Sequence, residues 1–380
     1  MNAPDFAAIR REFPTLERWV YLDSARKTVP PRCVEHAMQA YCKDIYEEAG
    51  ASAWDSSHLD TTRALLADLL GAKPSELAFV KNTTEGLNIA SHGFDLKPGD
   101  NIVITDREHV NNVWTWKHWE ARGVEVRAAQ HETGRLTLDA YRRVIDDRTR
   151  MISTAWVTYG NGYRVDLPAL GALCRERDIR LVVDGVQGAG ILNQRFDSLG
   201  ADVIALGGHK HLLGLTGTGL VWVREALIPQ LKTPFIKPLS AVGARENRQF
   251  DYVHDAHRLE GGNLSFLGLR VLAATGAFLR DIGLDRIEAR IQALTTRFME
   301  GARRAGIPVL TPTPWNERAQ IVSLGVDDPE GLRRALHAEK IVVNVKDDAL
   351  RVSASFYNNE EDMDRCLAAI LRLTKRKAAA

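Results

Sequence analysis

Between about residues 77 and 223, the chain alternates short runs of apolar, often β-branched residues with longer segments of helical period. The runs are LAFV, NIVIT, VEVRAA, RMISTAW, RLVVD, DVIAL and GLVWV. Such alternation favours βαβ units and a mostly parallel, seven-stranded sheet covered by helices. Several runs end directly in Asp, Gly, Asn or Thr. We therefore expect polar chemistry at the carboxyl edge of the sheet, where open α/β sheets bind ligands.

The flanking segments predict the rest of the fold. Residues 32–48 and 58–71 have helical spacing with apolar faces. The period is lost between about 230 and 262, where three prolines precede the sequence EGG, as is typical of a passage between domains. A helical stretch over 264–305, short apolar runs and a last helix from about 360 follow. We predict an α/β chain with a large domain over residues 16–255 and a small α+β domain over residues 256–380, which also includes residues 1–15.

Composition and charge exclude several classes of protein. The 380 residues are 45% hydrophobic and 26% charged, so a disordered or collagen-like chain is excluded. The net charge is +1 and the basic residues are dispersed, apart from the short run KRK at 375–377, so no nucleic-acid partner is expected. The chain has no run of about 18 apolar residues, and its first residues carry charges where a secretory signal needs an apolar run. We expect a cytoplasmic protein without a membrane segment.

An acid and a lysine stand at the ends of two successive predicted strands. Asp184 closes the run RLVVD, and Gln187 follows it three residues later among glycines. Twenty-six residues after Asp184, and after the run DVIAL, Lys210 occurs in the sequence GGHKH. Alone, Asp184 is typical of a helix N-cap and Lys210 of a solvated amine. Together, at the ends of sequential strands, they indicate one shared site.

This pair suits pyridoxal 5′-phosphate (PLP) as a cofactor. A PLP enzyme needs a lysine that forms a Schiff base with the aldehyde and a carboxylate that keeps the pyridine nitrogen protonated. Lys210 and Asp184 meet these two demands as catalytic residues, and Gln187 is placed to hydrogen-bond the phenolic oxygen. Burial and neighbouring positive charge would lower the pKa of Lys210 and so help it to carry a proton at Cα.

The cofactor's phosphate requires backbone N–H groups at a helix N-terminus. The sequence KNTTEGLN over residues 81–88 supplies a strand-to-helix turn in which Thr83 or Thr84 caps the helix. An ordinary N-cap explains the same residues equally well. His209, next to Lys210, is a second candidate donor to the phosphate.

These motifs together resemble those of a known family. The sequences LVVDGVQGAG, GGHKHLLGLTGTG and VKNTTEGLNIA, with YLDSA near the start, resemble the class V aminotransferase family of fold type I PLP enzymes. The family includes cysteine desulfurases, selenocysteine lyases, kynureninases and isopenicillin N epimerase-like proteins. The resemblance runs from about Tyr21 to the last helix. It implies PLP as the cofactor, a large PLP-binding domain, an amino-acid substrate and a homodimer.

The resemblance also implies roles for individual residues. Lys210 matches the lysine that carries the cofactor, Asp184 the partner of the pyridine nitrogen and Gln187 the partner of the phenolic oxygen. The residues that match the family's phosphate contacts are Thr83, Thr84 and His209. The segment LRVSASFYNNEE resembles the part of the family that binds the substrate carboxylate, and Arg351 matches its arginine. A guanidinium group suits this role because it can bind a carboxylate through two parallel hydrogen bonds.

A second segment is expected at the substrate. The sequence YLDSARKT over residues 21–28 is similar to the family's Y-L-D-N-A-A-T loop, so we expect Ser24, Ala25 and Arg26 to border the substrate. Arg26 and Lys27 replace small residues of that loop. They favour either a substrate with a second acidic group or a solvated charge pair.

The chain departs from the family near the cofactor ring. In the desulfurase pattern E-H-H-A-N the second histidine stacks on the ring, whereas this chain has EHVNN over residues 108–112. Val110 cannot stack as an aromatic ring does. Either His109 or Trp114 takes over that role, or Val110 covers the ring by an aliphatic contact alone. Gly207 stands where the family often has serine, so one phosphate hydroxyl is missing.

The cysteines argue against a desulfurase mechanism. Their positions, which show no C-x-x-C spacing for zinc or a dithiol pair, are Cys33, Cys42, Cys174 and Cys366. The desulfurase's mobile cysteine loop should lie between the runs IVVNV and LRVSA, yet only residues 346–349 separate them. The segment VTYGNGYRVDL looks more like the isopenicillin N epimerase-like branch, and its Tyr159 is expected to face the cofactor.

We therefore predict a PLP-dependent lyase that removes the Cα proton and eliminates a β-substituent, of the C–S type, without a persulfide cysteine. The alternatives are a class V aminotransferase, which converts an amino acid to a keto acid, and an epimerase. A non-catalytic binding protein that keeps the PLP fold is a further alternative. The joint presence of Lys210, Asp184 and Arg351 argues against it.

Overall fold

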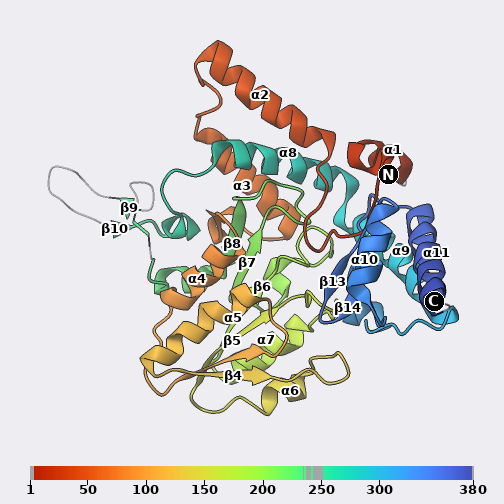
Figure 1. Ribbon diagram of the computed structural model, residues 1–380. Helices are drawn as coiled ribbons and strands as arrows, with labels where there is room; N and C mark the ends of the chain where they lie inside the picture. Colours follow the sequence, from red (N-terminus) through yellow and green to blue (C-terminus); the bar gives the residue numbers. More distant parts are fainter. Residues whose placement is uncertain (1–3, 234, 237–240, 243–250, 379–380) are drawn as a thin grey trace.

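The computed structural model describes residues 4–233, 235–236, 241–242 and 251–378 (Figure 1). Its centre is a seven-stranded sheet in the order β2-β8-β7-β6-β5-β3-β4. The strands are β2 (Leu77–Val80), β3 (Asn101–Thr105), β4 (Glu125–Ala129), β5 (Thr149–Ala155), β6 (Arg180–Asp184), β7 (Val203–Gly207) and β8 (Gly219–Val223). β8 runs antiparallel to both of its neighbours, and the other neighbours pair in parallel. The predicted α/β fold with a mostly parallel, seven-stranded sheet is confirmed.

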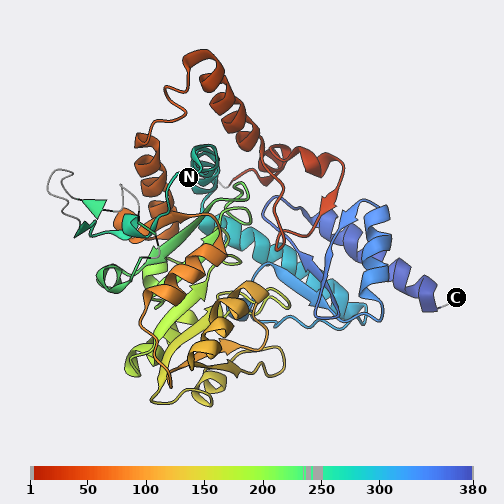
Figure 2. The same cartoon turned by 60° about the vertical axis from the view of Figure 1, so that its left-hand side comes forward.

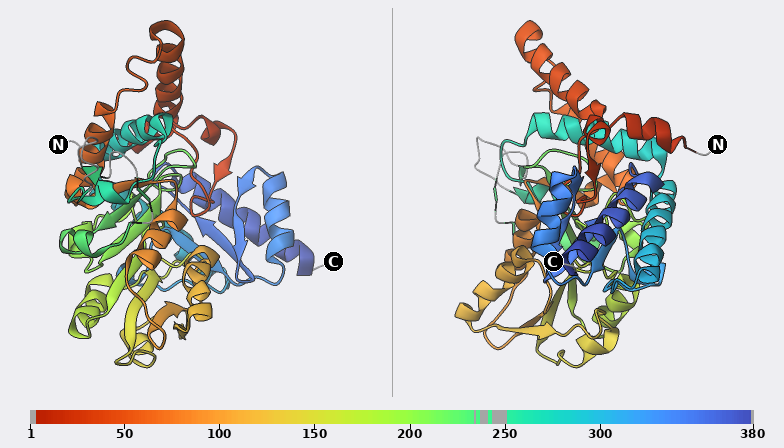
Figure 3. Two further views of the ribbon diagram at one scale, coloured as in Figure 1. Left: turned by 90° about the vertical axis from the view of Figure 1, so that its left-hand side faces the viewer. Right: turned by 45° about the vertical axis from the view of Figure 1, so that its right-hand side comes forward.

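Helices cover both faces of this sheet, which explains why its strands are apolar throughout (Figure 1). In β2, Leu77 and Phe79 pack into one core cluster, which α3, α7 and α8 complete, while Ala78 and Val80 pack into a second cluster with α4 and α5. The helices are α1 (Phe6–Arg11), α2 (Arg32–Glu48), α3 (Ser57–Leu70), α4 (Thr83–Gly93), α5 (Val110–Lys117), α6 (Leu138–Arg142), α7 (Leu167–Glu176), α8 (Phe266–Ile282), α9 (Leu284–Arg304), α10 (Pro329–Ala338) and α11 (Glu360–Ala378). The helical spacing over 32–48 and 58–71 therefore predicts α2 and α3 correctly. Figure 3 shows α2 projecting from the rest of the molecule.

A smaller layer lies beside the large sheet (Figure 2). Its antiparallel sheet has the order β11-β14-β13, with β11 (Ile321–Leu324), β13 (Asn344–Lys346) and β14 (Ala349–Ser353). A separate core cluster joins this sheet to α9, α10 and α11. A second antiparallel pair joins β9 (Ala241–Val242) and β10 (Asp251–Tyr252). No helix in the described part of the chain is long and apolar enough to cross a membrane.

Two elements make contacts across the domain boundary predicted at residue 255. β1 (Val20–Tyr21) pairs in parallel with β12 (Ile341–Val342), which joins the start of the chain to the smaller layer. α8 packs instead against α2 and α3, and its apolar side chains belong to a core cluster of the large sheet. The boundary itself stays a prediction. The β1–β12 pair matters for function because it carries the segment that follows β1 toward the small sheet.

Candidate active site

A cavity of about 570 Å³ opens at the carboxyl edge of the large sheet. Loops after β2, β3, β5, β6 and β7 form one wall, and the segment after β1 and the β13–β14 hairpin form the other. Its lining is Ala25, Arg26, Asn82, Thr83, Thr84, His109, Asn111, Ala155, Val157, Tyr159, Asp184, Val186, Gln187, His209, Lys210, Asn344, Lys346 and Arg351. The volume is in the range of small-molecule sites. The polar residues that the sequence predicts at this edge of the sheet therefore do line a cavity there.

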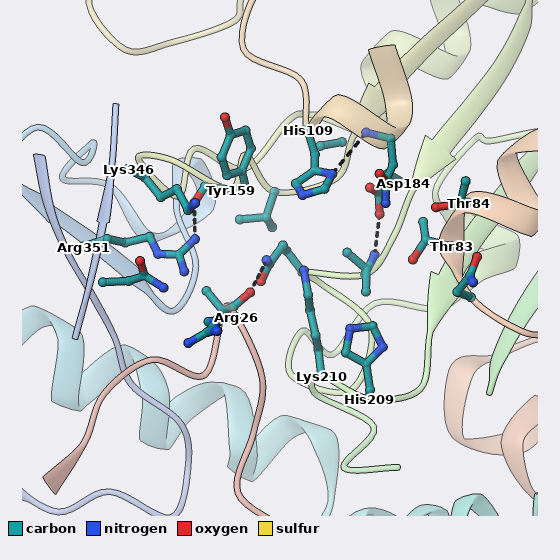
Figure 4. A pocket seen from close by; sticks show the side chains of 18 residues that line it. Arg26, Thr83, Thr84, His109, Tyr159, Asp184, His209, Lys210, Lys346 and Arg351 are labelled. Atoms are coloured by element: carbon teal, nitrogen blue, oxygen red, sulfur yellow. Dashed lines mark hydrogen bonds between the residues drawn. The ribbon is translucent and has the colours of Figure 1, made fainter. Parts of the chain in front are cut away.

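Lys210 and Asp184 project into this one cavity from neighbouring strands (Figure 4). Asp184 ends β6, and its register partner on β7 is Ala205. The Asp184 carboxylate accepts a hydrogen bond of 3.1 Å from the Val186 N–H, and burial raises its pKa, which the positive charge of Lys210 partly offsets. Burial, together with the positive charges of Arg351 and Lys346, lowers the pKa of Lys210 to about 8 against the opposing effect of Asp184. The Lys210 amine has no hydrogen-bond or ion-pair partner among the described residues, so it is available for chemistry.

The N-terminus of α4 forms one end of the cavity. The Asn82 side chain caps the helix by accepting a hydrogen bond of 2.9 Å from the Glu85 N–H. Thr83 and Thr84, in the first turn, lie with His209 at this end (Figure 4). The Nδ1 atom of His209 is buried without a hydrogen-bond partner, and burial lowers the pKa of His209 to about 4. A helix N-terminus and a neutral imidazole with an unused ring nitrogen suit a phosphate group.

Arg351 lies at the other end of the cavity, together with Arg26 and Lys346 (Figure 4). Its guanidinium donates a hydrogen bond of 2.8 Å to the Tyr159 carbonyl and forms an ion pair of 3.0 Å with Asp23. Both side chains of the pair are 2% exposed. The pair therefore fixes the orientation of the guanidinium in the cavity wall.

Known proteins resemble this chain over most of its length. The family model described as aminotransferase class-V matches residues 20–366. The chain belongs to this family. A probable cysteine desulfurase of Pyrococcus abyssi is 26% identical over 395 residues, which cover 97% of each chain.

Solved structures resemble the chain over nearly its full length. The apo structure of cysteine desulfurase from Thermococcus onnurineus NA1 has a TM-score of 0.88 at 24% identity, with 99% of each chain covered. The cystine C–S lyase C-DES, solved in complex with its reaction product cysteine persulfide, has a TM-score of 0.87 at 20% identity and covers 94% of this chain and 99% of its own. These two likenesses show the fold.

As a member of the class V aminotransferase family, the chain is a PLP-dependent enzyme. The residues of the cavity fit the cofactor. The free amine of Lys210 and the carboxylate of Asp184 suit the aldehyde and the pyridine nitrogen, and the unpaired Nδ1 of His209 beside the α4 N-terminus suits the phosphate. The individual contacts to PLP stay predictions.

Gln187 lines the cavity as predicted, with its side-chain amide fixed on both sides. Its Nε2 donates a hydrogen bond of 2.7 Å to the Ala25 carbonyl. Its Oε1 lies 2.9 Å from the Nε2 of Gln320 and 3.1 Å from the Nε2 of His211. These contacts hold Gln187 in place beside Asp184 and connect it to the loop after β1. A hydrogen bond from Gln187 to the phenolic oxygen of PLP stays a prediction.

Three residues predicted for this site do not line the cavity. Val110 and Trp114 are 55% and 69% exposed, because they lie one turn apart on α5 and face outward, whereas Trp116 of the same helix is buried. The Ser24 hydroxyl is buried and donates hydrogen bonds to the Ser353 and Ala354 carbonyls. Ala25 and Arg26, its neighbours, do line the cavity. Of the candidates for covering the cofactor ring, the structure brings His109 to the cavity.

Glu108 and its partners hold His109 at the start of α5. The buried Glu108 carboxylate accepts hydrogen bonds of 2.9 Å from Thr105 Oγ1, Asn112 Nδ2 and the Ala155 N–H. Burial raises the pKa of Glu108 to about 7, and the hydrogen bonds act in the opposite direction. His109 then packs edge-on against Tyr159, with ring centroids 5.4 Å apart. The network thus positions His109 and Tyr159 together at the cavity.

Sequence reasoning missed several lining residues, chiefly Asn82, Asn111, Asn344 and Lys346. The cap position of Asn82 before a helical segment was a usable signal. For Asn344 and Lys346 the signal is the alternation of a strand, since Arg351 pairs with Asn344 and Lys346 pairs with Ala349 in the hairpin. Asn344, Lys346 and Arg351 therefore share one face, but only the register reveals it.

The ring of His209 occupies the space next to Gly207. A methyl group at Gly207 would lie 2.8 Å from the His209 Nδ1 and 3.5 Å from Thr83 Oγ1. We expect Gly207→Ala to displace the ring and to weaken PLP binding about tenfold, which is the cost of one charge-assisted hydrogen bond. Equilibrium dialysis of the apo protein against PLP measures this affinity. In a His209→Ala background the same substitution should have little effect, and an equal loss in both backgrounds would refute the role of the ring.

The pKa of Lys210, lowered to about 8, gives a pH dependence. Only the neutral amine is a nucleophile, so the rate at which the apo protein captures PLP covalently should rise about tenfold per pH unit below pH 8 and level off above it. Stopped-flow absorption between pH 6 and 10 measures this rate. Lys346→Gln removes a neighbouring positive charge and should move the midpoint to higher pH. A midpoint near the ordinary lysine value in the unchanged protein would contradict the prediction.

Proposed function

We propose that the protein is a PLP-dependent lyase that eliminates a β-substituent, of the C–S type, from an α-amino acid without a persulfide cysteine. The observation that carries the proposal is a cavity lined by Lys210, Asp184 and Arg351 and by none of the four cysteines. Relatives named as cysteine desulfurases and a structural neighbour named as a cystine C–S lyase support the reaction class.

The positions of the cysteines support a mechanism without a thiol carrier. Cys174 and Cys366 are buried, Cys33 is half-buried and Cys42 is exposed on α2. Burial raises the pKa of the Cys174 and Cys366 thiols to about 12, which disfavours the thiolate needed for sulfur transfer. The β13–β14 hairpin turns in two residues and carries no cysteine. A leaving sulfur group would therefore depart as a free product.

In this proposal each of three cavity residues has a separate role. When bound, PLP supplies the electron sink that makes the Cα–H bond of the substrate acidic. Arg351 holds the substrate carboxylate, and Asp184 keeps a proton on the pyridine nitrogen. Lys210, whose amine is freed by the substrate, takes the Cα proton, because its lowered pKa makes the neutral base available near pH 8.

Product analysis tests the proposal. Elimination from cysteine or cystine releases pyruvate and ammonia, which coupled assays measure. An aminotransferase would instead yield a keto acid that keeps the side chain and leave the cofactor in its amine form, and an epimerase would return the amino acid with inverted Cα. Absence of pyruvate with every β-substituted amino acid tried would refute the lyase. Absence of any turnover would favour the binding protein.

Arg351→Lys should raise KM for the substrate by about tenfold or more, with a smaller effect on kcat. An ammonium group cannot contact Asp23, the Tyr159 carbonyl and a carboxylate in the geometry of the guanidinium fork. Steady-state kinetics of the holoenzyme give the two constants separately. The matched control is Arg164→Lys, because Arg164 is also largely buried and paired, with Glu288, but lies outside the cavity lining. A loss confined to kcat would argue against carboxylate binding.

We further propose that the protein is a cytoplasmic homodimer. The exposed Val110 and Trp114 support an interface, since they form an apolar patch on the helix that begins at the cavity residue His109. Four free thiols support a reducing compartment. Light scattering coupled to size-exclusion chromatography measures the assembly, and a monomer at micromolar concentration would refute the dimer.

A further inference from the structure

The charges at the Arg351 end of the cavity do not balance. Arg351 is neutralised by Asp23, whose second carboxylate oxygen accepts a hydrogen bond of 2.9 Å from Asn344. The carboxylate of Asp23 is therefore fully engaged within the wall. The positive charge of Arg351 is therefore already compensated by Asp23 before a substrate binds.

Two further cations line the same end without an acidic partner. Arg26 and Lys346 lie on either side of Arg351 (Figure 4). Neither has a carboxylate within ion-pair distance in the described part of the chain, although most other arginines of the protein are paired. Asp23 acts electrostatically on Arg26 as well, but its carboxylate is already engaged by Arg351 and Asn344. The end of the cavity therefore keeps an excess of positive charge for a ligand.

The β13–β14 hairpin explains how Lys346 comes to face the cavity. The hairpin turns through Asp347 and Asp348, whose φ angles of 50° and 56° are typical of a two-residue turn with left-handed residues. This turn sets Lys346 opposite Ala349, on the same face as Arg351. The tight turn thus places Lys346 at the position where the desulfurase pattern, which the chain resembles, is expected to have a longer loop.

Acidic groups near this hairpin do not cancel the excess. Asp347 lies outside the cavity lining and is not within ion-pair distance of Lys346. Its carboxylate packs against Gly160, so closely that a Cβ added to this glycine would lie 2.3 Å from the carboxylate oxygen. Asp184 faces the cavity beside Lys210, whose charge it opposes. An α-amino acid with a neutral side chain brings one carboxylate, which goes to Arg351 in the proposed function, so Arg26 and Lys346 stay without an anionic partner.

We infer that the substrate is an α-amino acid that carries a second anionic group, such as a carboxylate, sulfinate or phosphate, on its side chain, with Arg26 and Lys346 as specificity-determining residues. This inference rests on the proposed function, because it assumes that the amino acid binds in this cavity. The α-carboxylate lies at Arg351, and the second anion lies beside it, within reach of Arg26 or Lys346.

Matched pairs of amino acids test the inference by binding instead of turnover. The holoenzyme is titrated at low salt with L-aspartate and with L-asparagine, which has the same shape, and the change in visible absorption gives the two dissociation constants. We expect aspartate to bind about tenfold or more tightly, since one charge-assisted contact is gained. Lys346→Gln and Arg26→Gln should each reduce this preference, and the double variant should remove it. Lys97→Gln, which removes an equal charge from the loop before β3, outside the lining, should keep the preference.

Equal affinity for aspartate and asparagine in the unchanged protein would overturn the inference, and so would a preference that survives in the double variant. These outcomes are separate from failure of the lyase. Pyruvate formed from neutral substrates without any preference for acidic ones would refute the inference and leave the lyase intact. A preference for aspartate without pyruvate from any β-substituted amino acid would support the inference and refute the lyase.

Discussion

Replacement of Lys210 by alanine is expected to lower turnover by about a thousandfold or more, because the variant loses the amine that we propose both attaches the cofactor and takes the Cα proton. The structure favours this double role, since the Lys210 amine is free among the described residues and its pKa is lowered to about 8. Steady-state assays with the substrate found by product analysis give the loss. Reduction with borohydride followed by denaturation gives an independent result, because PLP should stay attached to the unchanged chain and not to the variant.

The control for Lys210→Ala is Lys97→Ala, which removes an amine from the loop before β3, outside the cavity lining. It should keep both turnover and the borohydride-stable cofactor. A cofactor that stays attached to Lys210→Ala would mean that another amine carries it. Lys346, the second lysine of the cavity, would then be the candidate.

Asp184→Asn is expected to lower kcat by about a hundredfold to a thousandfold, which is typical of the loss of one preorganised electrostatic group. Asparagine keeps the shape of the side chain but cannot hold a proton on the pyridine nitrogen. The acceptor of the 3.1 Å hydrogen bond from the Val186 N–H is preserved, so the fold should be unaffected. Steady-state kinetics and the near-UV circular dichroism of the holoenzyme measure the two effects.

The matched control for Asp184→Asn is Asp166→Asn. Asp166 caps α7 by accepting a hydrogen bond from the Ala169 N–H, outside the cavity lining, and asparagine caps a helix equally well. Activity should therefore be unchanged in this variant. If Asp184→Asn also kept its kcat, the carboxylate would have no part in holding the cofactor protonated.

The sequence predicts the cofactor end of the site better than the substrate end. Asp184 and Lys210 could be placed together because parallel strands deliver their carboxyl ends to one edge, whatever the lengths of the intervening helices. The contact between Asp23 and Arg351 could not, because it joins residues 328 positions apart and depends on how the smaller layer packs. The position of Lys346 in the cavity could not be predicted for a similar reason, because the face on which its side chain lies depends on the register of the β13–β14 hairpin.

The errors at α5 have a different physical origin. The segment VNNVWTWK has apolar residues on more than one side of a helix, so its pattern does not decide which side is buried. In the structure Asn112 and Trp116 turn inward and hydrogen-bond to each other, with Trp116 Nε1 2.9 Å from Asn112 Oδ1. Val110 and Trp114 consequently face outward. Trp116 is buried with a hydrogen-bond partner for its indole N–H, and this arrangement decides the orientation of the helix against the apolar character of Val110 and Trp114.

The pairing of β1 with β12, and of Asp23 with Arg351, has a consequence for biosynthesis. The residues predicted to contact the phosphate and the pyridine ring lie between Asn82 and Lys210, which the ribosome makes before Arg351. Once β8 has joined β2 to β7, a nascent chain can therefore assemble the predicted cofactor end of the cavity while the wall that carries Arg351 is still missing. We therefore expect the proposed amino-acid site to be completed after the cofactor end, when β1 pairs with β12 and Asp23 meets Arg351.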